Sequence, residues 1–318
     1  MRKLFLTFDT EDFISNNSIP VLKWILEQLR KHDLIALFFI TGNMAEKLQN
    51  SPAVVDLLSE HQIGYHASSH SVRPAIFEFT DVENYQQARK ISLERETASI
   101  NPLTGEIEGK GGILLLRELF PHRQIASFRA PGHCWTPPHL EALRTLGITF
   151  DFSTNLSSTT INFEGTTFYS YPTLGHWEGK RWEYRRLLTS VLKKKLIVLT
   201  CHPSLLVNKT AWDSIYFYSN PKTLTSPSPR TPAEARHLLH NFDSLLSNIS
   251  TLRKMQIINT TPKLESTNNT LKLTDSGIRE CYNWSMRWAI SLHHHPKFIF
   301  NHFLEYFKQT RSSDPRAE

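Results

Sequence analysis

The stretch LFLTFDTEDF, residues 4–13, passes from an apolar run directly to three acids, Asp9, Glu11 and Asp12. A short run rich in Leu and Phe is typical of a strand buried on both faces of a parallel sheet. The acids therefore fall where this first strand is expected to end. An isolated group of acids is usually solvated or caps the next helix, so the rest of the chain must decide whether these three carry chemistry.

Short apolar runs alternate with longer amphipathic runs along most of the chain. This alternation is the βαβ pattern of a parallel sheet covered by helices, and about seven such strands indicate a barrel or a wide open sheet. The expected strands cover residues 3–9, 34–42, 62–65, 124–131, 148–154, 195–203 and 255–262. The expected helices cover residues 20–33, 43–62, 137–147, 183–195 and 231–250. The last helix begins with Thr231 as its N-cap and Pro232 as its first residue.

The alternation stops after about residue 265. We expect a β/α domain over residues 1–265, a helical C-terminal extension over residues 266–310 and a disordered tail over residues 311–318. The extension carries an apolar stripe at positions i, i+3, i+4 and i+7 between Phe300 and Phe307. Packing against the β/α domain is the favoured explanation for this stripe, and membrane binding or dimerisation is the alternative.

The composition is that of an ordinary globular chain of 318 residues, 40% hydrophobic and 21% charged, which is enough to bury a sizeable core. The formal charge of +6 suggests contact with something anionic, without choosing among a phosphorylated substrate, a membrane surface and nucleic acid. Cys134, Cys201 and Cys281 have no metal-site spacing and indicate a reducing compartment. No signal sequence or long apolar segment is apparent, so a cytoplasmic chain is expected.

Titratable residues recur at or near the ends of the expected strands. Asp9, Arg129, Asp151 and His202 each occupy such a position. The carboxyl ends of parallel strands in β/α folds meet on one face, where active sites form. Each residue alone has an ordinary structural explanation, but four together predict a site.

The sequence HASSH, residues 66–70, follows the expected strand 62–65. Two histidines at i and i+4 lie on one face of a helical turn and can share a metal ion. A carboxylate from Glu11 or Asp12 would complete a set of two histidines and one carboxylate, which leaves positions open for water and substrate. The spacing lacks the glutamate of HExxH, which argues against a zincin-type protease.

Six segments together resemble the polysaccharide deacetylase family, the NodB-homology domain of carbohydrate esterase family 4. They are TFDTED (7–12), ALFFITGNMAEK (36–47), EHQIGYHASSH (60–70), FRAPGH (128–133), DFS (151–153) and LTCHP (199–203). The resemblance implies a distorted (β/α) barrel, usually with seven parallel strands, and a metal-dependent hydrolysis of an N- or O-acyl group, most often acetate on a sugar. This chain would be a cytoplasmic member with a D-T-E-D first motif.

The resemblance also implies a role for each matching residue. Asp9 falls on the general base and His202 on the general acid of the family. Arg129 falls on the arginine that orients the base, and Asp151 on the aspartate that supports the acidic histidine. His66 and His70 fall on the two metal-binding histidines.

Three departures from the family pattern affect the ligand and substrate assignments. Thr10 follows Asp9, so the metal carboxylate comes from Glu11 or Asp12, and Glu11 is favoured because D-x-D and D-x-E forms place it two residues after the base. Ala67 replaces the usual Ser or Thr of the second motif. The third motif reads RAPGH, which makes His133 and the nearby Trp135 candidate substrate contacts. The expected cofactor is one divalent ion, with zinc favoured over cobalt or nickel.

The expected substrate is an N-acylated sugar or glycan intermediate made in the cytoplasm, with no nucleic-acid partner. The basic run over residues 180–195 is favoured as a solvated helix face, with docking of phosphate or anionic lipid as the sharper alternative. That alternative suits a nucleotide or polyprenyl diphosphate carrier and peripheral contact at the inner membrane face. Two other functions stay open: a metal-independent amidohydrolase of the same fold, acting on cyclic ureides, and a catalytically silent module in glycan assembly.

Overall fold

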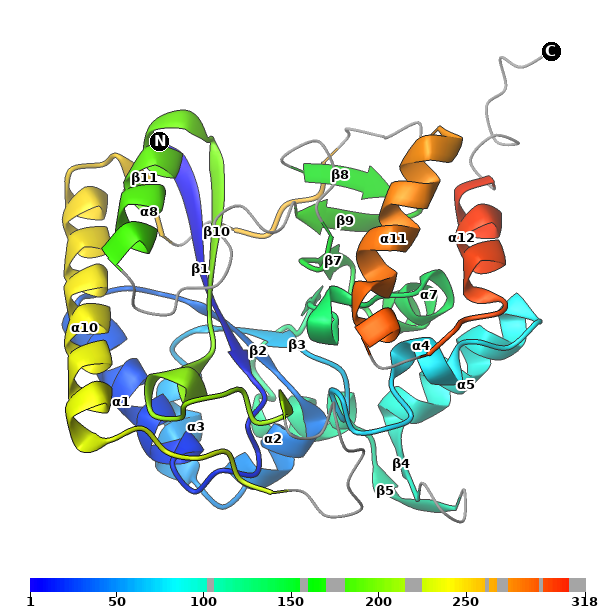
Figure 1. The fold of residues 1–318 in the computed structure, drawn as a ribbon, viewed down its shortest axis with the longest axis horizontal. Helices are drawn as coiled ribbons and strands as arrows, with labels where there is room; N and C mark the ends of the chain where they lie inside the picture. The colour runs from blue at the N-terminus through cyan, green and yellow to red at the C-terminus, as the bar shows by residue number, and fades with distance from the viewer. Residues whose placement is uncertain are drawn as a thin grey trace. The chain divides into compact units, whose positions relative to one another are not determined.

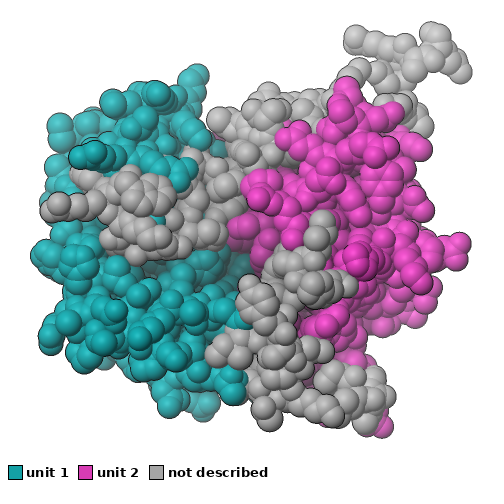
Figure 2. Space-filling model, in the orientation of Figure 1, with its two compact units in different colours: residues 1–66, 115–125, 171–264 teal, residues 67–114, 126–170, 265–318 magenta. Residues whose placement is uncertain are grey.

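The computed structural model describes residues 1–101, 106–154, 160–169, 181–214, 225–260, 263–267, 274–291 and 294–308. The chain divides into two compact units, which are coloured separately in Figure 2. Unit 1 comprises Met1–His66, Leu115–Ile125 and Tyr171–Leu264, and unit 2 comprises Ala67–Leu114, Ala126–Ser170 and Glu265–Glu318. The expected helical extension is thus part of unit 2, while the domain boundaries stay a prediction and the expected tail lies outside the described residues.

The described strands of unit 1 all run parallel to their neighbours (Figure 1). The first strand has neighbours on both sides and is buried from Leu4 to Thr10, which explains its apolar sequence. Phe8 stacks on Phe38 of the next strand, with ring centroids 4.7 Å apart. The strands, in their order across the sheet, are β10 (Leu196–Cys201), β1 (Arg2–Thr10), β2 (Leu37–Ile40) and β3 (Gln62–Tyr65), and β11 (Ile258–Asn259) pairs with the start of β1.

Helices connect these strands, as the amphipathic runs predict. The run expected as a single helix over residues 43–62 is two helices, because Pro52 lacks the N–H and the space to continue the first one. The N-cap predicted at Thr231 is present, since its side chain accepts from the backbone N–H of Glu234, and Glu234 completes a capping box. The helices within unit 1 are α1 (Ser18–Lys31), α2 (Gly42–Leu48), α3 (Pro52–Leu58), α8 (Arg181–Lys193), η2 (Pro203–Leu206) and α10 (Pro232–Lys254).

Unit 2 contains a second set of strands. It also contains an antiparallel hairpin, which the sequence analysis does not predict. Its parallel strands are β6 (Ser127–Phe128), β7 (Phe150–Asp151) and β9 (Thr166–Tyr169), and β8 (Thr160–Phe163) runs antiparallel to β9. The hairpin is formed by β4 (Ala98–Ile100) and β5 (Ile107–Lys110). Its helices are α4 (Ile76–Phe79), α5 (Tyr85–Thr97), η1 (Pro131–His133), α7 (Pro137–Thr145), α11 (Asp275–Ser291) and α12 (Ile299–Lys308). Helix α6 (Gly112–Leu119) contains the division between the units.

The stripe between Phe300 and Phe307 packs inside unit 2, as its favoured explanation requires. Phe303 and Phe307 of α12 are buried. The Phe303 ring contacts Trp135 at 4.8 Å between centroids, and the Phe307 ring contacts Phe163 at 4.7 Å. Apolar burial of this kind stabilises a helix against its unit by roughly 1.5–3 kcal/mol for each buried Phe.

The predicted fold class is confirmed. It is α/β, with mostly parallel strands of the type found in a distorted (β/α) barrel and with helices at the C-terminal end of the chain (Figure 1). Among the helices that the structure describes, none combines the length and the apolar composition that crossing a membrane would need.

Candidate active site

The end of β1 and the turn after it contain four consecutive buried polar residues, from Asp9 to Asp12. The backbone here is fixed by hydrogen bonds, since the N–H of Thr41, just after β2, donates to the carbonyl of Thr10 and the N–H of Phe13 donates to the carbonyl of Glu11. Burying a carboxylate is costly unless it gains polar partners. The partners of each acid therefore indicate what it does.

Asp12 closes the turn that carries it. Its Oδ1 accepts from the backbone N–H groups of Ser15 at 2.9 Å and Ile14 at 3.2 Å, and its Oδ2 accepts from the amide of Asn208 at 3.3 Å. This is the arrangement of an Asx turn. Burial raises the pKa of Asp12, while the two N–H donors and Lys47 oppose that rise.

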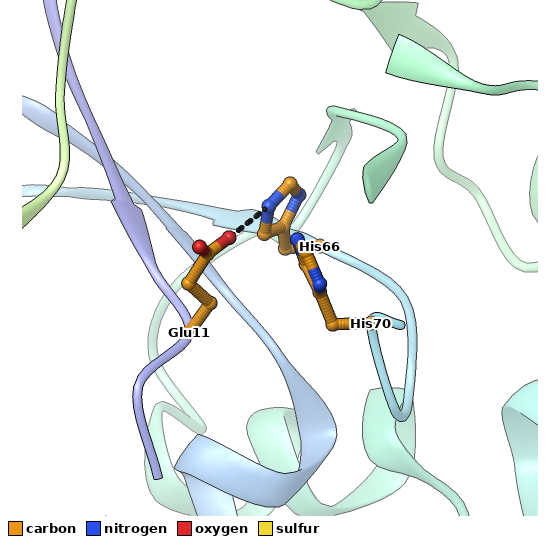
Figure 3. Close-up of side chains that lie close together, drawn as sticks. All are labelled: Glu11, His66 and His70. Atoms are coloured by element: carbon orange, nitrogen blue, oxygen red, sulfur yellow. Dashed lines mark hydrogen bonds and ion pairs between the residues drawn. The ribbon is translucent and has the colours of Figure 1, made fainter. Parts of the chain in front are cut away.

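Glu11 points instead toward the histidines of the HASSH segment (Figure 3). One carboxylate oxygen, Oε2, lies 3.0 Å from Nε2 of His66. Glu11, His66 and His70 are all buried and offer ligand atoms that lie within 4.8 Å of one another. Two imidazoles and a carboxylate at this spacing are a donor set that divalent transition ions accept, so these residues fit the expected metal. Asp12 is not in this group, and the choice of Glu11 as ligand stays a prediction.

The HASSH segment is not helical, and the expectation of a helical turn at residues 66–70 is wrong. His66 continues the sheet register, because its N–H donates to the carbonyl of Ile40 at 3.0 Å. The chain then turns back through positive φ angles of 63° at Ala67 and 52° at His70. The hydroxyl of Ser71 lies 3.1 Å from Nδ1 of His70, a contact of the kind that orients metal-binding rings.

Asp9 and His202 meet because they follow paired residues of neighbouring strands. Phe8 of β1 is opposite Cys201 of β10, so the next residue of each strand lies at the same carboxyl end. Nε2 of His202 lies 3.6 Å from Oδ2 of Asp9 and 4.0 Å from Oε1 of Glu11. The Asp9 side chain is buried and the His202 side chain is 17% exposed. A buried carboxylate beside a partly exposed imidazole can exchange protons with solvent through the ring.

Arg129 directly follows β6 and Asp151 lies on the neighbouring strand β7, where Phe128 is paired with Asp151. Arg129 is buried, and its Nε donates to the carbonyl of Phe152 at 3.4 Å. The Asp151 carboxylate accepts from the N–H and the hydroxyl of Ser153, at 2.8 and 2.7 Å. Burial raises the pKa of Asp151 to about 7, against the opposing effects of Ser153 and Arg129. Their roles toward Asp9 and His202 stay predictions.

The two predicted substrate contacts differ in exposure. His133 ends η1 at a φ of 61° and is half-buried. Trp135 is 0% exposed, and its ring packs against Phe168 and Phe303. Because no part of its surface is open, Trp135 packs as a core aromatic in this structure, and its prediction as a substrate contact is not retained. His133 remains a predicted substrate contact.

Two side chains that support the site were not found from the sequence. The amide of Asn208 holds Asp12, and the carboxylate of Glu96 accepts from Ser68 in the HASSH segment. Asn208 lies just after η2, in the short polar segment of residues 208–210, which is ordinary for a loop. Glu96 lies near the end of α5, among polar residues that look like a solvated helix face. Neither position carries a motif that would have identified it.

Comparisons with known proteins give fold-level likenesses only. No family model and no curated protein sequence matches the chain. A Mycobacterium smegmatis structure classed as a polysaccharide deacetylase is 14% identical, with a TM-score of 0.45, and the match covers 83% of this chain and 94% of that one. A 4-alpha-glucanotransferase from Thermococcus litoralis is 15% identical, with a TM-score of 0.43, covering 81% and 39% of the two chains.

A family 4 carbohydrate esterase from Streptomyces lividans, in complex with acetate, is 13% identical with a TM-score of 0.40, and the match covers 81% of this chain and 90% of that one. At these identities and TM-scores, the likenesses carry no argument about what this chain does. The resemblance to polysaccharide deacetylases therefore rests on the sequence motifs and on the residues that they bring together.

Proposed function

We propose that the protein is a metal-dependent hydrolase that removes an acyl group, with N-acetyl favoured, from a sugar or glycan intermediate. The observation that carries the proposal is that the Asp9–His202 pair adjoins the Glu11–His66–His70 group, with His202 4.0 Å from Glu11. A base, an acid and a ligand set are the three parts that such a hydrolysis needs.

Glu11, His66 and His70 would hold one divalent ion, with zinc favoured over cobalt or nickel. Their imidazole and carboxylate donors suit these ions, and three protein ligands leave a position open for water and substrate. When bound, such an ion polarises the acyl carbonyl and lowers the pKa of the attacking water. Asp12 serves the same site indirectly, because it holds the turn on which Asp9 and Glu11 lie.

Asp9 is the general base in this proposal. Its Oδ2 takes a proton from the attacking water, and Arg129 is assigned to keep the carboxylate ionised and oriented. His202 is the general acid, because a sugar amine leaves only when it is protonated, and Nε2 is the atom that faces Asp9. Asp151 is assigned to orient His202, a role that an acceptor carboxylate fills above its pKa of about 7.

The substrate class is proposed more finely from surface charge. The exposed side of α8 and the residues after it is strongly basic, with Arg185, Arg186, Lys193, Lys194 and Lys195 all exposed. Such a surface attracts a diphosphate. We therefore favour, as the substrate, a cytoplasmic N-acylated sugar carried on a nucleotide or a polyprenyl diphosphate. The protein would then contact the inner membrane face peripherally. His133 is assigned to contact the sugar.

The test is release of acetate or formate from a panel of nucleotide-linked, lipid-linked and free N-acylated sugars, with Asp9→Asn as the blank. Release that requires Asp9 and disappears on chelation supports the proposal. Release that continues after complete metal removal would favour the metal-independent amidohydrolase instead. Binding of glycans without release from any acylated substrate would favour the silent module. Equal rates of release from free and carrier-linked sugars, with no dependence of the rates on salt, would overturn only the proposal of a diphosphate carrier.

A further inference from the structure

The segment between His66 and His70 needs support from outside itself. It forms no helix or strand, and Ala67 and His70 both have left-handed backbone angles. For residues other than glycine this conformation costs roughly 1–2 kcal/mol each. A loop that holds such angles at two positions stays in one shape only when surrounding contacts restrain it.

Hydrogen bonds at Ser68 restrain this segment. The backbone N–H and the hydroxyl of Ser68 both reach the same carboxylate oxygen, Oε2 of Glu96, at 3.1 and 2.9 Å. Its hydroxyl also lies 3.1 Å from the carbonyl of Arg95 and accepts from the N–H of Gly112 at 3.0 Å. A single serine therefore links the histidine segment to the end of α5 and to the start of α6.

Glu96 is itself fixed by a second buried partner. Its other oxygen, Oε1, lies 2.6 Å from Nε2 of His139 on α7, and the two side chains are 2% and 0% exposed. The His139 ring packs beside Phe79 and Phe128. In such apolar surroundings each carboxylate oxygen needs a polar partner, and His139 on one oxygen holds the carboxylate in the orientation in which the other meets Ser68.

The backbone around Glu96 is packed as tightly as its side chain. A Cβ added at Gly111 would lie 2.4 Å from the carbonyl oxygen of Glu96, so only glycine fits there. The N–H of Gly111 donates to the carbonyl of Thr97 at 2.9 Å. Gly112, which donates to Ser68, is therefore set directly against the last turn of α5.

We infer that Glu96, oriented by His139, acts through Ser68 as a positioning residue that holds the His66–His70 segment in its metal-binding shape. The inference rests on the proposed function, because it takes His66 and His70 as metal ligands. In this account Glu96 acts through Ser68 and is not itself a metal ligand. Its effect is to restrict the loop to the conformation in which the two imidazoles and the Glu11 carboxylate can bind the same metal ion.

The test uses Glu96→Leu in the full chain, with Glu96→Gln as the conservative variant. Zn²⁺ affinity is measured by competition with a chelator, and the visible spectrum is recorded with Co²⁺ bound. Leucine removes the acceptor for Ser68, so Zn²⁺ affinity should fall by about 10- to 100-fold, as for other losses in the supporting shell. Glutamine keeps an oxygen for Ser68 and should restore most of the affinity.

Glu141→Leu is the matched control. Glu141 lies on α7 and, like Glu96, links α5 with α7, since its carboxylate accepts from the Tyr85 hydroxyl at 2.9 Å. The Glu141 residue is 9% exposed, and its hydrogen bond with Tyr85 does not involve the histidine segment. This control should lose thermal stability while keeping the wild-type Zn²⁺ affinity and Co²⁺ spectrum.

Two results would overturn the inference. One is wild-type Zn²⁺ affinity in Glu96→Leu, and the other is an equal loss of affinity in Glu96→Leu and Glu141→Leu. If Glu96→Leu does not fold, Ser68→Ala tests the same link, and wild-type affinity in that variant would likewise overturn it. If the wild-type chain binds no Zn²⁺, the proposed function and the inference are both contradicted. If it binds Zn²⁺ with an affinity that does not change on substitution of Glu96, only the inference is contradicted.

Discussion

The two segments that carry the proposed metal ligands are held in different ways. The turn after β1 is closed by its own residues, because Asp12 accepts from N–H groups two and three positions later. The segment from His66 to His70 is held at Ser68 by Glu96 and Gly112, which are 28 and 44 positions away. One ligand segment is thus held mainly by hydrogen bonds within its own turn, with Asn208 as an additional distant donor, while the other is held by distant residues. Substitutions should therefore affect the two segments differently.

The largest expected effect comes from Asp9→Asn at the end of β1. Asparagine keeps the size of the side chain but cannot accept the proton from water, so the rate of acyl release should fall by about 10²- to 10⁴-fold. Metal content should stay at the wild-type level because Asp9 is not a proposed ligand. Steady-state rates and metal analysis of the same preparation check this. A variant that keeps its rate would show that the turn supplies no base.

Glu11→Gln and Asp12→Asn compare two neighbouring acids of the same turn. Glu11→Gln should weaken metal binding by at least roughly 10- to 100-fold, since it replaces a proposed ligand. Asp12→Asn should leave the metal affinity near wild type and lower stability by about 1 kcal/mol, the scale of a weakened buried hydrogen bond. Chelator competition and urea denaturation separate these outcomes. The reverse pattern would reassign the ligand to Asp12.

An effect on stability alone is expected from pH at Asp151, whose carboxylate is held within its own turn as that of Asp12 is. Its pKa is raised from 3.8 to about 7 by burial. Between these values the unfolded chain is ionised while the folded chain keeps its proton. The stability that Asp151 contributes is therefore fully present below pH 3.8 and is lost as pH rises through 7, by at most about 1.4 kcal/mol per pH unit.

The measurement is the free energy of unfolding in urea from pH 4 to 8, for the wild type and Asp151→Asn. The advantage of the wild type over the variant should shrink as the pH rises. Parallel curves would show that Asp151 ionises in the folded state as it does in the unfolded one.

Much of unit 1 could be predicted because its signals are local. The apolar run before Asp9 predicts β1, and the Thr231–Pro232 pair predicts the start of α10, as observed. The strand-end rule also predicts that Asp9 and His202 meet, because parallel pairing places the two carboxyl ends together. These inferences need only the spacing of apolar residues along the chain and the residues at the ends of the strands and helices.

The remaining features depend on contacts between segments far apart in the sequence. Spacing alone suggested a helical turn for HASSH, whereas Ser68 is tied to Glu96 in a loop. Trp135 looked suited to sugar stacking beside His133, but the ring is enclosed by Phe303 from α12. Nothing in a single sequence shows which distant side chain will cover or hold such residues.

Metal content tests the central claim, that Glu11, His66 and His70 hold an ion, most directly. The measurement is elemental analysis of the purified wild type, the double variant His66→Ala/His70→Ala and a control, His237→Ala/His240→Ala, which removes two exposed histidines of α10. The wild type and the control should each hold about one divalent ion per chain, and the His66/His70 variant none. Full occupancy in the His66/His70 variant would contradict the account.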